Sequence, residues 1–123
     1  MEDERTQHPL LRVAPVDVSP LPKALEAAPA ARVMLLNWQR SSGGKPTLLT
    51  LKNANVMFDI AMVELIMGIE TLLEELPADR IVFGSYAPVF YFESAKLKLQ
   101  ESALDAKQTN AITHENAARF IAG

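Results

Sequence analysis

The chain contains no cysteine, so it has no disulfide framework, no thiolate nucleophile and no zinc site built on sulfur. Positive charge is not in excess either: 12 basic against 15 acidic residues give a net charge of −3, which offers no electrostatic footprint for nucleic acid or an anionic membrane. The order typical of an export signal is also missing, because residues 1–9 are polar and acidic. We therefore expect a cytoplasmic protein that binds neither nucleic acid nor membrane.

Long hydrophobic runs are scarce as well. The most apolar stretch, residues 56–69, is interrupted by Asp59, Glu64 and Gly68 and is too short and too charged to span a bilayer. Nearly half of the 123 residues (49%) are nevertheless hydrophobic, which is enough to build one core. We expect one domain over residues 10–123, preceded by a polar segment.

Predicted strands and helices alternate along the first half of the chain. Residues 10–18, rich in Val and Leu, predict a strand, and Ser19-Pro20 then marks the start of a helix that Pro29 ends. The continuous apolar run 32–38 predicts a second strand covered on both faces. Residues 39–46 predict a loop, whose glycines and lysine lack the spacing of a phosphate-binding loop.

The second half continues the alternation. Residues 56–63 predict a third strand, or alternatively a helix from about Asn53, and residues 69–76 have the apolar period of a helix. Residues 81–83 predict a fourth strand, which runs into a turn at 84–88. A sheet built in this order is parallel.

The carboxyl end is predicted to be helical. Asp105 and Gln108 have the spacing of a capping box. Residues 116–121 predict a closing helix that packs through Phe120 and Ile121.

Two segments resemble a known family. They are residues 76–88, LPADRIVFGSYAP, and residues 112–120, ITHENAARF. They resemble the carboxyl end of amidohydrolase-related proteins, metal-dependent hydrolases and decarboxylases on a (βα)8 barrel, in which "P-x-R-I-x-F-G-S-D-x-P" forms the last strand and "N-A-x-R-x-[FLI]" the last helix. The resemblance implies an α/β fold that is the carboxyl-terminal half of a (βα)8 TIM barrel, with about four parallel strands and flanking helices, and a divalent metal, Zn or Mn.

The chain departs from the family pattern at two points. Tyr86 stands where the family has a metal-binding Asp, and a phenol with an ordinary pKa near 10 neither ligates a metal nor acts as a base readily at neutral pH. The His-x-His pair of the family's first strand is absent. A full barrel needs eight strands, so we expect a fragment of a longer protein, or a chain that self-associates or pairs with a missing amino-terminal half.

Six residues are candidates for the site, because barrel enzymes collect such groups where strands end. Tyr86 and Asp17 are the catalytic candidates, and Asp17 is alternatively turn chemistry with Ser19-Pro20, the interpretation we favour. The substrate-binding candidates are Asn37, Ser85 and Tyr91. His8 is the candidate metal ligand and is otherwise a solvated loop histidine.

Four further residues have open roles. Asp59 lies in a largely apolar strand, so it is functional, partnered, or on an exposed helix face. His114 is predicted to cap the last helix or lie on the surface. Phe90 and Phe92, which form an aromatic cluster with Tyr91, are predicted to pack or alternatively to line a pocket.

Three hypotheses for function follow. The first is an amidohydrolase-like metal-dependent hydrolase or decarboxylase of a small organic substrate. The second is a catalytically silent half-barrel that serves as a binding or structural module. The third is a free-standing flavodoxin-like α/β binding domain.

Overall fold

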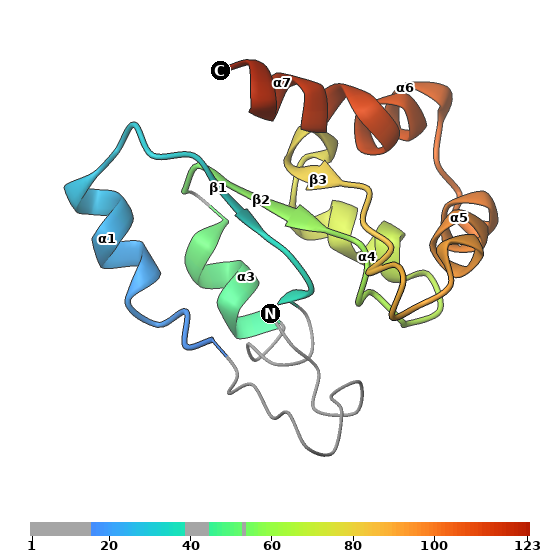
Figure 1. Cartoon of the computed structure of the whole chain (residues 1–123), viewed down its shortest axis with the longest axis horizontal. Coiled ribbons are helices and arrows are strands. Elements are labelled where there is room, and N and C mark those ends of the chain that lie inside the picture. The colour runs from blue at the N-terminus through green and yellow to red at the C-terminus, as the bar shows by residue number, and fades with distance from the viewer. Residues whose placement is uncertain (1–15, 39–44, 53) are drawn as a thin grey trace.

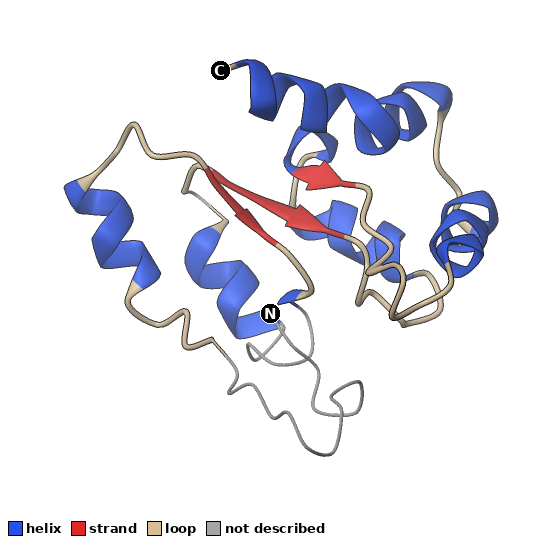
Figure 2. Cartoon of the chain, viewed as in Figure 1, coloured by secondary structure: helices blue, strands red, loops and turns tan. Residues whose placement is uncertain are grey.

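The computed structural model describes residues 16–38, 45–52 and 54–123, and within them three strands form one parallel sheet. Figure 2 shows the three arrows pointing the same way. The order across the sheet is the order along the chain: β1 (Val33–Leu35), β2 (Val56–Asp59) and β3 (Ile81–Val82). Val33 pairs with Val56, and Phe58 pairs with Ile81. The predicted α/β class with a parallel sheet is therefore confirmed, with three strands in the described residues.

Helices connect the strands and lie in two groups, one on the side of β1 and the other on the side of β3. Figure 1 shows α1 and α3 on the β1 side, and α4 to α7 on the β3 side. The helices are α1 (Leu21–Ala27), α3 (Lys45–Leu51), α4 (Gly68–Glu75), α5 (Phe92–Glu101), α6 (Ala106–Asn110) and α7 (Asn116–Ala122), with a 3-10 turn η2 (Ala78–Arg80) and a π turn η3 (Ala111–Glu115). None of the helices in the described ranges is long and apolar enough to cross a membrane.

The hydrophobic core lies between the sheet and these helices. Its largest buried side chains are Trp38, Leu51, Phe58, Ile60, Ile69, Leu76, Ile81 and Ile112. Trp38 and Phe58 meet edge to face with ring centroids 5.1 Å apart, a favoured aromatic geometry. The core therefore joins all three strands to α3, α4 and the carboxyl-terminal helix.

Several predicted strand boundaries were wrong. The first expected strand, residues 10–18, lies mostly outside the described residues, and residues 16–18 form no strand. The third strand ends at Asp59 and the chain turns over residues 60–62, so neither the longer strand nor the helix from Asn53 is present. Asp59, the last residue of β2, therefore lies at the C-terminal end of the sheet.

Two helices were missed. Residues 45–51 form α3, where a loop was expected at the start; Pro46 is acceptable there because the first helical N–H groups have no partner inside the helix. Residues 92–101 form α5, which begins at the last residue of the aromatic run 90–92, where no separate helix was expected. With α3 present, each strand pair is joined through a helix, as parallel pairing requires.

The carboxyl-terminal helix runs from residue 106 to residue 122 through the π turn. The predicted capping box at its start is confirmed: Asp105 Oδ1 accepts from the Gln108 N–H at 2.7 Å, and Gln108 Oε1 accepts from the Asp105 N–H at 3.0 Å. The predicted packing through Ile121 is wrong, because Ile121 is 81% exposed and the buried positions are Ile112 and Asn116. Phe120 is half-buried beneath the Arg32 guanidinium.

This helix binds the outer side of β3. The Phe83 N–H donates to the Ile112 carbonyl at 2.8 Å, within the π turn, and Asn116 Nδ2 donates to the Ile81 carbonyl at 2.7 Å. Ile60 bonds to Val82 from the β2 side, so Ile81 and Phe83 are the residues whose backbone faces outward. The outward Phe83 N–H and Ile81 carbonyl are therefore satisfied within the chain.

The Arg80 side chain binds backbone carbonyls at the N-terminal end of β2 and at the end of α3. Its guanidinium donates to the Val56 carbonyl at 2.6 and 2.8 Å, to the Leu51 carbonyl at 3.0 Å and to the Lys52 carbonyl. The carbonyls at the end of α3 have no partner inside that helix. Arg80 supplies their donors and ties α3 to the start of β2.

Asn116 is expected to be a strong stability determinant. Its side chain is fully buried, donates to the Ala78 and Ile81 carbonyls, and accepts from Arg119 Nη2 at 2.9 Å. Asn116→Ala removes the side-chain donor from the Ile81 carbonyl and one of the two donors from the Ala78 carbonyl, and is expected to cost about 2 kcal/mol of unfolding free energy. Urea denaturation measures the loss against Asn110→Ala, an exposed position on the same helix. Equal stability of the two variants would contradict this role.

Candidate functional site

Polar residues lie where the three strands end, at the C-terminal end of the sheet, here called the carboxyl edge. Asn37 follows β1, Asp59 is the last residue of β2, and Gly84 and Ser85 follow β3. In parallel α/β folds this edge is where ligands are usually bound. The edge therefore defines the candidate site.

Asp59 is the buried centre of the carboxyl edge, with 3% of its surface exposed. Its Oδ1 accepts from the Asn37 N–H at 2.9 Å, and the Ala61 N–H also donates to the carboxylate. Its backbone carbonyl accepts from Trp38 Nε1 at 2.9 Å. Asp59 is thus partnered, and it links the segment after β1 to the turn after β2.

Burial changes the ionisation of this carboxyl. Removal from water raises the pKa of Asp59 from 3.8 to about 6, although the hydrogen bonds from Asn37 and Ala61 and the charge of Lys98 oppose the rise. A carboxyl with this pKa changes its protonation state close to neutral pH. Such groups are concentrated at functional sites, because proton transfer is most efficient near the working pH.

Gly84 covers the Asp59 carboxyl. A Cβ on Gly84 would lie 2.5 Å from Asp59 Oδ2 and 2.9 Å from Asp59 Cγ. Glycine is required here by the close approach of backbone to carboxylate. The glycine of the GSY turn thus fixes the distance between β3 and Asp59.

Lys98 reaches the carboxyl edge from α5, which Figure 1 shows beyond the ends of β2 and β3. Its Nζ donates to the Ile60 carbonyl at 2.7 Å and to the Ala61 carbonyl at 3.1 Å. Burial lowers the pKa of Lys98, and Asp59 opposes that change. No local sequence pattern selects Lys98, because its contacts lie 37 and 38 residues away along the chain.

A pocket of about 340 Å³ opens between α5 and the turns after β2 and β3. Its lining combines apolar, hydroxyl and charged groups: Ala61, Glu64, Ser85, Val89, Phe90, Tyr91, Ser94, Ala95 and Lys98. The volume suits a small organic molecule. The pocket lies beside the carboxyl edge rather than at a remote surface.

Two of the predicted substrate-binding residues line this pocket. Ser85 is half-buried, and its Oγ accepts from the Ala87 N–H at 3.3 Å, so the hydroxyl proton is left to donate elsewhere. Tyr91 is 83% exposed at the rim. Asn37 lies at the carboxyl edge and contributes its backbone N–H to Asp59.

Tyr86 follows Ser85 in a left-handed conformation, with φ of 54°, that is rare for an aromatic residue. Its ring meets Phe90 edge to face, with centroids 5.4 Å apart. Phe92 packs in the same way on Phe83 at 5.5 Å. The aromatic cluster therefore packs on itself and shapes the turn beside the pocket.

The remaining candidates lie apart from the carboxyl edge. Asp17 is exposed and its two oxygens accept from the Ser19 N–H and Oγ, both at 2.9 Å, which lowers the pKa of Asp17 and matches the turn interpretation. His114 is exposed inside the carboxyl-terminal helix, so it does not cap the start of that helix. His8 and the polar segment 1–9 lie outside the described residues.

The described residues do not form a metal site by themselves. Nowhere in residues 16–38, 45–52 and 54–123 do three His, Asp or Glu side chains lie close enough together to hold a metal ion. Asp59 already accepts from two backbone N–H groups. The donor set does not fit a Zn or Mn ion bound by this part of the chain alone, and we assign no step to a metal.

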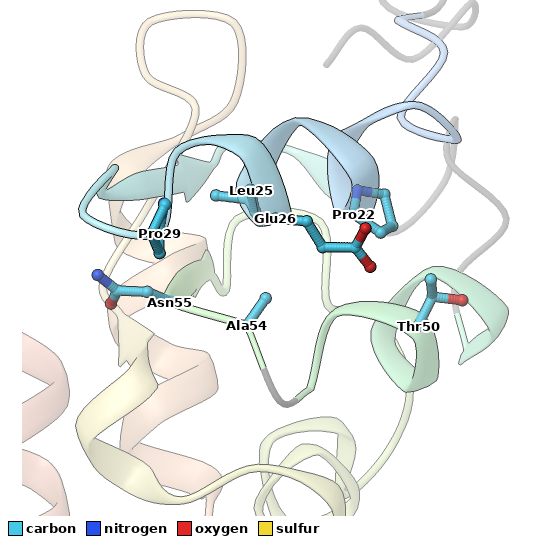
Figure 3. Close-up of a pocket in the computed structure, with 7 residues that line it drawn as sticks. All are labelled: Pro22, Leu25, Glu26, Pro29, Thr50, Ala54 and Asn55. Carbon is cyan, nitrogen blue, oxygen red and sulfur yellow. The ribbon is translucent and has the colours of Figure 1, made fainter.

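A second hollow lies between α1 and the end of α3. It measures about 470 Å³ and is lined by Pro22, Leu25, Glu26, Pro29, Thr50, Ala54 and Asn55 (Figure 3). Thr50 and Asn55 already donate to the Pro46 and Ala31 carbonyls. The hollow adjoins the amino ends of β1 and β2, the stability side of parallel α/β folds rather than the reactive side.

The carboxyl edge thus has a half-buried amine and a hydroxyl in the wall of a pocket for a small molecule, and next to that pocket a buried carboxyl with a pKa of about 6. These groups suit binding and proton transfer on a small organic molecule. A scan of protein-family models, a search of curated proteins and a search of solved structures found no match to this chain.

Proposed function

We propose that this chain acts in the cytosol as the carboxyl half of an amidohydrolase-like (βα)8 barrel that hydrolyses or decarboxylates a small organic substrate at the carboxyl edge. The observation that carries the proposal is the buried Asp59, with a pKa of about 6, where the strands end beside a pocket. Both reactions need proton transfer near neutral pH.

Residues of the family-like segments support the proposal through the contacts they make. Asn116 and Arg119 bind the turn before β3, and Arg80 binds carbonyls at the end of α3 and at the first residue of β2. Gly84 sits against Asp59. The residues that resemble the family pattern therefore hold β3, the carboxyl-terminal helix and Asp59 in place relative to one another.

The role that we propose for each residue depends on whether its side chain lines the pocket. Ser85 and Tyr91 line the pocket and are proposed to bind substrate oxygens. Asp59 is covered by Gly84, so we give it a positioning role: it orders the turns after β1 and β2 and sets the charge beside Lys98.

Further strands are proposed to join at β1. No strand in the described residues pairs with the outer side of β1, whereas the carboxyl-terminal helix already binds the outward groups of β3. A closed (βα)8 barrel also pairs its last strand with its first, so the proposal requires that helix to release Ile81 and Phe83 when the barrel closes. Strands from a second copy or from an amino-terminal half would protect the open edge of β1.

Asp59→Asn is expected to lower kcat about 100-fold, the size of effect that a small misplacement of site residues can cause, and to remove a limb near pH 6 from the pH–rate profile. The assay follows acid release or CO2 release from small lactones, esters, amides and organic acids, with Zn or Mn added. Asp79→Asn, which changes an exposed carboxylate in η2, is the control. An unchanged limb in Asp59→Asn would contradict the positioning role.

A catalytically silent binding module is the second candidate. It is favoured by Tyr86 at the position of the family Asp and by a donor set, in the described residues, that does not fit a metal. A silent module predicts that compounds of the assay panel bind without turnover and that the purified protein holds no stoichiometric Zn or Mn. Turnover that depends on Asp59 would exclude it.

A further inference from the structure

Lys98 is held at the carboxyl edge by two backbone carbonyls. Its Nζ lies 2.7 Å from the Ile60 oxygen and 3.1 Å from the Ala61 oxygen, and the side chain is half-buried in the wall of the pocket. The other described lysines, apart from Lys45, have exposed side chains; they are Lys23, Lys52, Lys96 and Lys107. Lys98 is therefore in a different chemical environment from these four.

The two carbonyl partners of Nζ leave one of its positions unoccupied by a protein hydrogen bond in either protonation state. An ammonium has three N–H groups, whereas a neutral amine has two N–H groups and one lone pair. With two N–H groups on the Ile60 and Ala61 carbonyls, the remaining position of Nζ is left for the pocket. Burial favours the neutral form and lowers the pKa of Lys98.

We infer that Lys98 is a nucleophile that forms an imine with a small aldehyde or ketone bound in this pocket. Desolvated lysines beside other polar groups are the usual amines of such chemistry. The inference goes beyond the proposed function and does not depend on a metal or on a second half of a barrel.

The reaction balances without an oxidant or a reductant. The ammonium first gives one proton to water, and the Nζ lone pair then attacks the carbonyl carbon, so that a C–N bond forms and the carbonyl π electrons move to oxygen. That oxygen takes one proton from Nζ, which gives the carbinolamine, and a second from the hydronium ion formed in the first step, and it leaves as water while the C=N bond forms. The products are one imine and one water for each amine and carbonyl consumed.

The pocket wall indicates the kind of carbonyl compound. Ala61, Val89, Phe90 and Ala95 offer apolar contact to a short carbon body, and Ser85 offers a hydroxyl to the carbinolamine oxygen. Glu64, exposed in the same wall, adds negative charge. An uncharged aldehyde or ketone therefore fits better than one that carries a carboxylate.

Reductive trapping tests the inference on the wild-type chain. The protein is treated near neutral pH with 2-butanone and sodium cyanoborohydride, and peptide mapping locates the sec-butyl amine. We expect the label on Lys98, with Lys96 on the same helix and Lys107 at background. Label spread over the exposed lysines with none in excess at Lys98, or no label at Lys98, would overturn the inference and would be the result for a lysine that only clamps α5 to the turn.

Two variants sharpen the test. Lys98→Arg can keep hydrogen bonds to the two carbonyls but has no nucleophilic amine, so the pocket-specific label is expected to be lost while circular dichroism stays native. Asp59→Asn removes the charge that keeps Lys98 protonated and is expected to increase the Lys98 label. An increase in that variant is opposite in sign to the expected loss of hydrolase or decarboxylase turnover, so failure of one proposal is distinguishable from failure of the other.

Discussion

Gly84→Ala is expected to destabilise the fold by about 3 kcal/mol, the upper end of the cost of overpacking a buried site. The new Cβ would lie 2.5 Å from Asp59 Oδ2 and 2.9 Å from Asp59 Cβ and Cγ, distances that van der Waals contacts do not permit. Asp59 cannot turn away freely, because backbone N–H groups of Asn37 and Ala61 hold its carboxylate. Either β3 moves away from β2 or the carboxylate loses these partners. Urea denaturation at neutral pH measures the cost.

The clash with Asp59 is isolated by a double-mutant cycle. Gly84→Ala is expected to cost at least about 1 kcal/mol less in an Asp59→Ala background, because the crowded carboxyl atoms are absent. Asp59 Cβ remains at 2.9 Å, so the rescue is partial. A Gly84→Ala penalty that is the same in both backgrounds would show that the substitution acts elsewhere.

Asp59→Asn is expected to change the pH dependence of stability by about 3 kcal/mol. The pKa of Asp59 rises from 3.8 to about 6 on folding, a difference of about two units at about 1.4 kcal/mol each. The folded state therefore binds this proton more tightly than the unfolded state. The contribution to stability is fully present below about pH 4, declines as the pH rises, and is lost above about pH 6.

The comparison is made by urea denaturation at about pH 4 and about pH 8. The free energy of unfolding of Asp59→Asn, relative to wild type, is expected to be about 3 kcal/mol more favourable at the higher pH. Asp79→Asn makes the same chemical change at an exposed position and is expected to stay within about 0.5 kcal/mol of wild type at both. A parallel response of the two variants would mean that Asp59 is not buried as described.

The architecture followed from short-range patterns where these were strong. The capping box at Asp105 and Gln108 and the strand at residues 81–83 depend on neighbouring residues alone, and both were predicted nearly to the residue. α3 was missed because the Gly-Lys-Pro sequence at its start is typical of loops, while the burial of Leu48 and Leu51 that stabilises it comes from tertiary contacts.

The carboxyl-terminal helix shows why packing faces are harder to predict than helices. A π turn at residues 111–115 shifts the helical register, so Ile112 and Asn116 face the sheet and Ile121 faces solvent. A regular helical period cannot anticipate that shift. A buried asparagine also contradicts the expectation that the core positions are apolar, and only its carbonyl partners at Ala78 and Ile81 explain it.

The candidate site was predictable in place but not in detail. The rule that parallel strands end at one edge pointed to Asn37 and Ser85, and the structure places Asn37 at the carboxyl edge and Ser85 in the pocket wall. Asp59 was noticed as costly to bury, yet only the structure shows its cover by Gly84. Lys98 carries no local signal, because the groups that define its chemistry come from β2 and its turn.

Carbon-13 NMR titration of the Asp59 carboxyl tests the central claim most directly, namely that the strands hold a buried acid poised near neutrality at the carboxyl edge. The carboxyl resonance that disappears in Asp59→Asn identifies the residue. The account predicts a midpoint of about 6. A midpoint at or below about 4, the value of a solvated aspartate, would contradict it.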